Sequence, residues 1–296
     1  MASARRDACQ PELFKVLDVG MDETPKPLVT FVTVNYKTPH HIRQLLKGVE
    51  EANFRFSFEY ILVDNASADG SIEMVRERFP WVRVVENPKN SGYGAGNNLA
   101  LADARGEYVM LFNPDVMVFP CEVEAWLEWM HARPDVGISG PRILNPDGSD
   151  QESCYRFPNL LTPVLRRTFV GRMPGARKAL DRYTMKAMNR SLEQDVDWVL
   201  GAAMLIRKSV LESVGHFDER FFMYFEEADI CRRAWSAGHR VTYAPVARFM
   251  HYHGRESRIR FPWEFVTNKL ARVHLMSGLK YFLKHLGSPD PRTKAV

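Results

Sequence analysis

Apolar and polar blocks alternate along the first half of the chain. Four short apolar runs have the length and the β-branched content of buried strands. They are residues 28–35, 60–63, 82–86 and 108–112. Polar helical patterns separate the first three of them, at about 40–53 and 71–79. This alternation predicts an α/β fold with a mostly parallel central sheet and helices on both faces.

The second half has a less regular pattern. Residues 197–207 (DWVLGAAMLIR) are apolar enough for a buried strand, and 240–243 and 247–253 read as two further short strands. A helix is predicted from the acidic cluster at 226–229 to about 237, and an amphipathic helix within 262–285. Residues 155–190 are basic and have no clear period.

Composition limits the class of protein. With 296 residues, 45% of them hydrophobic, the chain is long enough to bury one large core or two smaller ones. No apolar run approaches the ~18 residues of a membrane span, and the N-terminus lacks the apolar region of a secretory signal. The four cysteines are far apart and form no disulfide framework. These features favour a cytoplasmic location.

The net charge of +4 is unevenly distributed. Residues 155–190 carry nine Lys and Arg against one acid, and 251–296 carry nine against three. The remainder of the chain is therefore acidic, with two basic segments attached to it. Nucleic-acid binding is disfavoured, because no zinc spacing or recognition motif accompanies the basic segments.

Polar clusters follow the predicted strands, where ligands bind in open α/β sheets. Asp64 ends one strand, and as a hydrogen-bond acceptor it could contact a nucleotide; a local turn would explain it equally well. Residues 90–98 (NSGYGAGNN) are expected to form a glycine-rich loop that opens a helix to about residue 104. Its glycines allow close backbone approach, to a ligand or to packed neighbours. Asp115 follows another strand and could help to hold a divalent cation, or simply form a turn.

Two later clusters carry titratable groups. Glu226, Glu227 and Asp229 lie beside four aromatic residues, where burial can raise a carboxyl pKa enough for general-base work. The same acids also suit a helix N-terminus. His251 and His253 share one face if their segment is a strand, and one of them could bind a metal ion.

Taken together, seven segments resemble family 2 glycosyltransferases of the GT-A fold, in particular their bacterial rhamnosyltransferase-like branch. In chain order they are TFVTVNYK (30–37), YILVDNASADGS (60–71), ENPKNSGYGAGNN (86–98), YVMLFNPD (108–115), DWVLGAAMLIRK (197–208), GHFDERFFMYFEEADICRR (215–233) and HYHG (251–254). The resemblance implies a single GT-A domain over 27–255, with 155–190 as a basic acceptor-side insertion. Residues 1–26 would be an appendage and 256–296 a basic helical tail.

The resemblance also implies roles for individual residues. Asp115 matches the last acid of the family's metal-binding D-x-D, whose first acid is replaced here by Asn113. His251 would complete a shell for Mg²⁺ or Mn²⁺. Glu227 occupies the position of the catalytic base, where the family more often has Asp, and Glu226 stays an alternative. The nucleotide sugar would contact Asn35, Asp64, Asn65, Gly92, Asn97, Asn98 and Asn113. Acceptor contacts would fall on Trp198, Gly201 and Asp229.

The activity implied is inverting transfer of a sugar from a nucleoside-diphosphate sugar to a hydroxyl of a glycan or polyprenyl-diphosphate-linked acceptor in cell-surface polysaccharide assembly. dTDP-L-rhamnose is the favoured donor; a UDP-sugar donor, or nucleotide-sugar binding without catalysis, are the alternatives.

The basic tail, with aromatic and basic residues interspersed over 261–285, suggests peripheral contact with an anionic membrane at the inner face of the cell membrane. A solvated helix packed on the catalytic body is the alternative.

Overall fold

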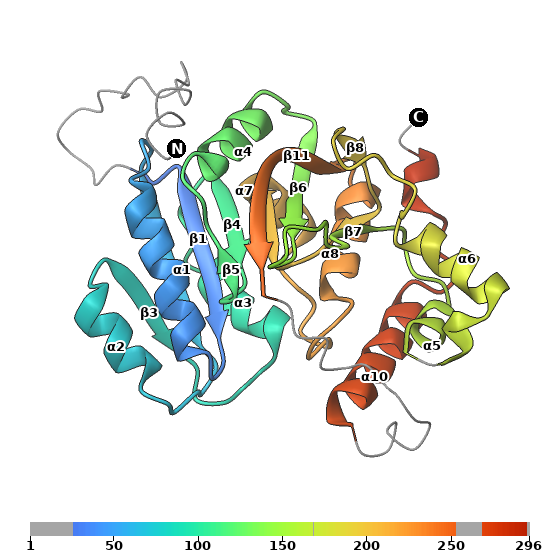
Figure 1. Cartoon of the computed structure of the whole chain (residues 1–296), viewed down its shortest axis with the longest axis horizontal. Coiled ribbons are helices and arrows are strands. Elements are labelled where there is room, and N and C mark those ends of the chain that lie inside the picture. The colour runs from blue at the N-terminus through green and yellow to red at the C-terminus, as the bar shows by residue number, and fades with distance from the viewer. Residues whose placement is uncertain (1–25, 168, 253–267, 295–296) are drawn as a thin grey trace.

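A mixed sheet of nine strands forms the centre of the molecule (Figure 1). The computed structural model describes residues 26–167, 169–252 and 268–294. The strands of the first half are β1 (Val29–Asn35), β2 (Phe58–Asp64), β3 (Val82–Glu86), β4 (Tyr108–Phe112) and β5 (Val116–Met117). Four of them lie side by side in the order β3-β2-β1-β4 and are parallel. Their carboxyl ends therefore share one edge of the sheet, where ligands bind in open α/β folds.

The strands of the second half extend the sheet beyond β4. They are β6 (Val136–Leu144), β8 (Gln194–Asp195), β10 (Ala203–Arg207) and β11 (Arg240–His251). β10 is antiparallel to both β4 and β6, and β11 is parallel to β6. β11 ends beside β5, with His251 opposite Val116, so its last residue reaches the turn that follows β4. A separate ribbon pairs β7 (Cys154–Tyr155) with β9 (Trp198–Val199).

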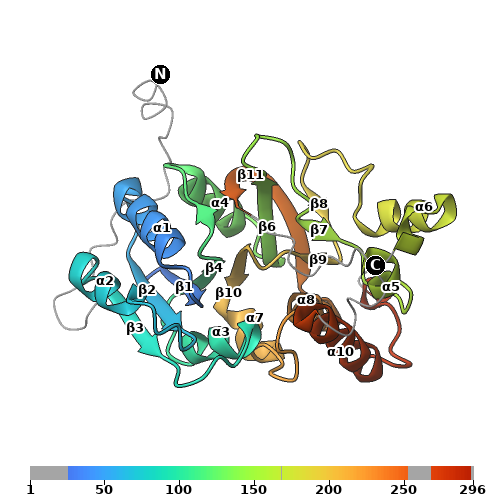
Figure 2. The same cartoon turned by 60° about the horizontal axis from the view of Figure 1, so that its bottom comes forward.

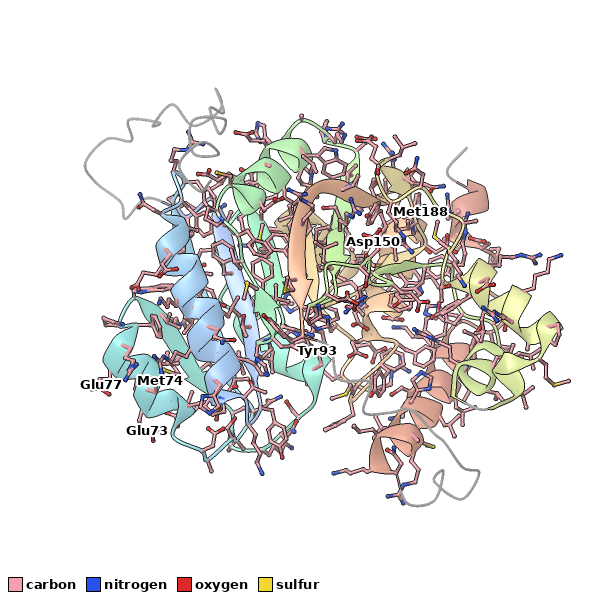
Figure 3. The ribbon with its side chains drawn as sticks, viewed as in Figure 1. Glu73, Met74, Glu77, Tyr93, Asp150 and Met188 are labelled. Carbon is pink, nitrogen blue, oxygen red and sulfur yellow. The ribbon has the colours of Figure 1, made fainter. Side chains whose placement is uncertain are left out.

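Helices cover both faces of the sheet (Figures 1 and 2), and Figure 3 adds the side chains in the view of Figure 1. One face packs against α1 (Pro39–Ala52), α2 (Ser71–Arg78) and α4 (Glu122–His131). The other packs against α3 (Tyr93–Leu101), α7 (Lys208–Val214) and α8 (Glu226–Ser236). At one end of the molecule lie α5 (Thr162–Arg167), η1 (Phe169–Arg172), α6 (Pro174–Tyr183), α10 (Lys269–Lys284) and η2 (Pro291–Lys294).

Strand β4 shows how the sequence creates the two layers. Successive side chains of a strand point to opposite faces. Tyr108, Met110 and Phe112 accordingly enter the core under α1, α2 and α4, whereas Val109 and Leu111 enter the core under α3, α7 and α8. All five are buried, as the continuous apolar run required. The predicted α/β architecture is therefore confirmed, and its sheet is mixed because β10 is antiparallel to both neighbours.

Three predicted elements differ in detail. The single strand expected over 197–207 is two strands, β9 and β10, because residues 200–202 turn away from the ladder. The two strands expected at 240–243 and 247–253 are one long strand, β11, with register shifts against β6 in its middle. The glycine-rich segment expected to be a loop is mostly helix, since α3 begins at Tyr93.

Other predictions concern residues that the structure does not describe. Outside the described residues lie 1–25 of the appendage predicted at 1–26, His253, and the part of the basic tail up to residue 267, with Phe261, Trp263 and Phe265. The domain boundaries stay predictions. Within the described ranges, none of the helices has both the length and the hydropathy needed to cross a bilayer.

Candidate active site

Polar side chains gather where β1 and β2 end in register. Asn35 and Asp64 are paired in the ladder, and the Asn35 amide donates to Asp64 Oδ1 at 2.8 Å. The same amide nitrogen lies 3.1 Å from Ser67 Oγ and 2.9 Å from Ser71 Oγ. Asp64 Oδ2 accepts the N–H of Ser67 at 3.0 Å, so the turn that the sequence allowed does form. Each carboxylate oxygen keeps a second lone pair for a ligand.

Gly92 shows why this chain has glycine before α3. Its φ of +92° favours glycine, and a Cβ there would lie 2.0 Å from the carbonyl oxygen of Phe222. The carbonyl of Gly92 accepts from the Asn65 amide at 2.9 Å, and the N–H of Tyr93 donates to Phe222 at 2.9 Å. A Cβ at Gly96 would lie 2.9 Å from Val34 Cγ1. Close packing, the alternative to ligand binding, thus accounts for these glycines.

Two asparagines of α3 have a different position from the one expected. Asn97 and Asn98 were predicted in a loop facing the nucleotide, but both lie within the helix. The Asn97 amide donates to the carbonyl of Tyr93 one turn earlier, at 2.9 Å. Asn98 accepts from the N–H of Phe217 at 3.0 Å and donates to its carbonyl at 2.8 Å. Their amides hold the protein's own backbone, so the predicted loop position is wrong.

The candidate metal site lies where β11 reaches the turn after β4. Tyr252 donates its N–H to the carbonyl of Asp115 at 3.0 Å, which fixes the two chain segments together. His251 is 3% exposed, and its Nε2 lies 3.3 Å from Asp115 Oδ1. Its Nδ1 lies 2.7 Å from Gln151 Oε1. A histidine that donates Nδ1–H to an oxygen presents Nε2 as a metal ligand.

The pair Asp115 and His251 fits a divalent cation. Burial would raise the pKa of Asp115, but its hydrogen bond with His251 outweighs burial and holds that pKa below its ordinary value. Cis ligands of an octahedral ion such as Mg²⁺ stand roughly 3 Å apart, close to the separation found here. No cluster of three His, Cys, Asp or Glu suited to a metal occurs among the residues that the structure describes. Donor phosphate oxygens would have to supply further ligands.

The backbone of Asn113 connects the turn that carries Asp115 to the residues around Glu227. Its N–H donates to the carbonyl of Ala202 at 2.9 Å. The neighbouring Gly201 donates its N–H to Glu227 Oε1 at 3.3 Å, and its carbonyl accepts from the Tyr93 hydroxyl at 2.7 Å. The turn at 200–202 therefore contacts three segments: the turn that carries Asp115, helix α3 and the first turn of α8.

The two adjacent glutamates have distinct surroundings. Glu227 is partly exposed, and burial raises its pKa despite the opposing backbone hydrogen bonds. Glu226 is 2% exposed, and its Oε2 has no hydrogen-bond partner among the described residues. Burial and then the charge of Glu227 raise the pKa of Glu226 well above the ordinary value. Burial also raises the pKa of Tyr93, which keeps its hydroxyl protonated as a donor to Gly201.

The three predicted acceptor residues lie in different places. Gly201 faces Glu227, as described. Trp198 is 8% exposed, stacks on Tyr155 with ring centroids 4.3 Å apart, and donates its indole N–H to the carbonyl of Arg156. Asp229 is fully buried and pairs with Arg233 of its own helix at 2.9 Å. It also holds two residues at the end of α10, Lys284 at 2.7 Å and His285 at 2.9 Å. Its carboxylate thus anchors α10.

Sequence reasoning missed three residues that build this site. Gln151 orients His251 across 100 residues of sequence, so no local pattern marks it. Ser67 and Ser71 each accept a hydrogen bond from the Asn35 amide. Their four-residue spacing just after the strand is a signal that could have marked them.

The sheet order and its polar carboxyl edge are those of a GT-A glycosyltransferase. Solved structures with the same fold include GalNAc-T7 with UDP, GalNAc and Mn²⁺, at a TM-score of 0.57 and 12% identity over 78% of this chain and 45% of that one. Another is the mannosyltransferase PcManGT from Pyrobaculum calidifontis in complex with GDP-Man and Mn²⁺, at a TM-score of 0.51 and 19% identity, covering 99% and 79%. At these identities the likeness shows the fold.

The chain belongs to glycosyltransferase family 2. The model of that family, described as Glycosyl transferase family 2, matches residues 30–215. An N-acetylglucosaminyl-diphospho-decaprenol L-rhamnosyltransferase of Mycobacterium tuberculosis is 32% identical over 232 residues, 75% of each chain. The rhamnosyltransferase WbbL of Escherichia coli is 28% identical over 65% of this chain and 70% of its own. The protein is therefore a glycosyltransferase, as its sequence motifs indicated.

Proposed function

We propose that this glycosyltransferase moves an L-rhamnosyl unit from dTDP-L-rhamnose to a hydroxyl of a polyprenyl-diphosphate-linked glycan in cell-surface polysaccharide assembly. The names of two relatives support the sugar and the acceptor class. The observation that carries the chemistry is the turn at 200–202, which links Glu227 to the turn of the Asp115–His251 pair.

Glu227 is the general base in this proposal. It is partly exposed and held at one oxygen by the N–H of Gly201, whereas Glu226 is buried. A raised carboxyl pKa brings a base closer to the pH at which it works, and this improves proton transfer. Glu227 takes the proton from the acceptor hydroxyl as that oxygen bonds to the anomeric carbon. The bond from that carbon to the nucleoside diphosphate breaks, so the product has the inverted configuration.

Asp115 and His251 would hold a divalent cation, Mg²⁺ or Mn²⁺, with Gln151 fixing the histidine ring. When bound there, such an ion would supply positive charge for the departing diphosphate. Asn35, Asp64 and Asn65, at the ends of β1 and β2, form the edge that faces the nucleotide. Asn113 stands two residues before Asp115 and supplies a neutral amide where a second carboxylate would add charge. Asp115 would therefore be the one carboxylate for the cation, and the donor phosphates would add further ligands.

The test is a donor panel. Purified protein is incubated with dTDP-L-rhamnose and with UDP- and GDP-sugars, each with a short-chain N-acetylglucosaminyl-diphospho-prenol, and the product anomer is assigned by NMR. We expect an inverted rhamnosyl product from dTDP-L-rhamnose, lost on chelation and in Glu227→Gln, while that variant still binds the donor. Faster transfer from a UDP-sugar would replace the donor assignment. Donor binding without transfer or hydrolysis would overturn the enzyme proposal in favour of a binding protein.

A further inference from the structure

Helix α10 has one face packed against the protein and one face exposed to solvent. Its inner face holds the body of the enzyme: Tyr281 is 1% exposed, Ser277 donates to the carbonyl of Met223 at 2.9 Å, and Gly278 lies against the ring of Phe225. Lys284 is also on this side, where it pairs with Asp218 and Asp229. The aromatic and basic residues counted toward a membrane face from sequence thus include Tyr281 and Lys284, which point inward.

The outer face of α10 is apolar along its middle. Met276, Leu279 and Leu283 are 54%, 53% and 64% exposed, and Leu286, just beyond the helix, is 80% exposed. Spacings of three and four residues place the first three on one side of a helix. We call these four residues the apolar stripe. Neighbouring α5 and the turn before it add exposed Leu160, Leu161 and Val164, and Pro163 lies against Gly278 of α10. Contiguous exposed apolar residues of this kind mark an interaction surface.

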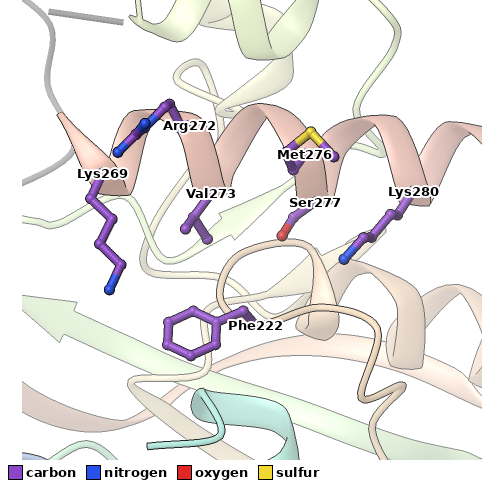
Figure 4. A pocket seen from close by; sticks show the side chains of 7 residues that line it. All are labelled: Phe222, Lys269, Arg272, Val273, Met276, Ser277 and Lys280. Carbon is purple, nitrogen blue, oxygen red and sulfur yellow. The ribbon is translucent and has the colours of Figure 1, made fainter. Parts of the chain in front are cut away.

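Cations border the apolar stripe. Lys269, Arg272 and Lys280 lie on the same side of the helix, and α10 contains no acidic residue. They line a cavity of about 230 Å³ together with Phe222, Val273, Met276 and Ser277 (Figure 4). Lys280 is fixed by its bond to the carbonyl of Arg220 at 2.7 Å. No ion pair to Lys269 or Arg272 forms within the part of the chain that the structure describes.

We propose that the apolar stripe and its cations dock the protein on an anionic lipid bilayer, with Met276, Leu279, Leu283 and Leu286 in the acyl boundary and Lys269, Arg272 and Lys280 at the headgroup phosphates. An interfacial helix combines these two features. A second copy of the chain is a poorer occupant, because a two-fold interface would place the three cations against their own copies. The inference is independent of the donor and acceptor assigned above.

Flotation of the full-length protein with vesicles tests the proposal. We expect recovery with phosphatidylcholine vesicles that contain phosphatidylglycerol, and little recovery with phosphatidylcholine alone. Leu279→Asp/Leu283→Asp should lower the bound fraction at least tenfold. The matched control is Leu192→Asp, because Leu192 is 60% exposed just before β8 and should float like the wild type. Lys269→Gln/Arg272→Gln should lower the partition coefficient about 25-fold, ~1 kcal/mol for each charge.

Two results would overturn the proposal. One is equal flotation of the wild type and both double variants, provided that circular dichroism spectra show that all three proteins are folded. The other is a dimer, seen by light scattering, that Leu279→Asp/Leu283→Asp converts to a monomer without any vesicle binding by the wild type. Transfer to a water-soluble acceptor fragment does not need a bilayer, so loss of docking and failure of the proposed activity are separate outcomes.

Discussion

Gly201→Ala probes how closely the backbone holds the proposed base. A Cβ at this position would stand 2.7 Å from Glu227 Oε1, 2.8 Å from the Tyr93 hydroxyl and 3.0 Å from Glu227 Cγ. Ordinary contact begins at 3.4 Å, so the carboxylate has to move by about 0.7 Å. The φ of Gly201 is not in the left-handed region, and the effect is therefore steric.

A shift of that size is costly to proton transfer. A misplacement of ~1 Å can lower a rate by about 10²-fold, so kcat should fall roughly 10- to 100-fold. The donor KM should change little, because Asn35 and Asp64, the proposed nucleotide contacts, are placed by β1 and β2. Overpacking should also lower the free energy of unfolding by about 1–3 kcal/mol.

The assay is initial-rate kinetics of sugar transfer, with donor affinity from calorimetry and stability from urea unfolding. Gly175→Ala is the matched control, since a Cβ at Gly175 in α6 meets no heavy atom within 4 Å. In a Glu227→Asp background the shorter side chain leaves room for the added methyl group, so Gly201→Ala should cost less there. A wild-type kcat in Gly201→Ala, or an equal loss in both backgrounds, would refute the role of Gly201 in placing Glu227.

Three further predictions follow from the same contacts. Because burial raises the pKa of Glu227 and the base has to be ionised, kcat should fall as the pH drops through a value above the ordinary 4.5 of a glutamate, measured as a pH–rate profile. Gln151→Leu removes the acceptor for Nδ1 of His251 and should weaken Mn²⁺ binding about 10- to 100-fold, measured by calorimetry with dTDP present. Asp229→Asn removes the buried carboxylate that pairs with the partly buried Arg233 of α8 and Lys284 of α10, and should lower the free energy of unfolding by about 3 kcal/mol, measured in urea.

Each has a clear contrary result. A glutamate with its ordinary pKa is already mostly ionised at pH 5. A kcat that stays constant between pH 5 and 8 would therefore contradict a raised pKa of the catalytic base. Unchanged Mn²⁺ affinity in Gln151→Leu would separate the ring orientation from metal binding. An Asp229→Asn protein as stable as the wild type would show that the ion cluster does not hold α10.

The strand framework could be predicted because it depends on local patterns. A run such as Tyr108–Phe112 is apolar on both faces only if helices cover both faces, and this is what the structure has. The position of Asp64 at a strand end followed in the same way. These inferences need no knowledge of distant contacts.

The interior geometry of the site could not be predicted, because it depends on distant segments. The break at 200–202 arises where the backbone approaches Glu227, and Gln151 meets His251 only through the folded sheet. Asn98 looks like a ligand-binding amide in sequence, yet the loop at Phe217 uses its hydrogen bonds. Which side chains of α10 face the protein and which face solvent is likewise set by the packing of that helix against Phe225.

The backbone just before Glu226 affects how much of the chain a folded catalytic fragment has to include. Tyr224 and Phe225 both have a φ of +72°, a conformation that costs non-glycine residues roughly 1–3 kcal/mol each and persists only under tight packing. Residues His274, Tyr281 and Phe282 of α10 provide that packing against Phe225. A chain cut after residue 252 would keep all of the predicted site residues and still lose the clamp that shapes the start of α8. We therefore expect the smallest active fragment of the chain to include α10, beyond the family match at 30–215.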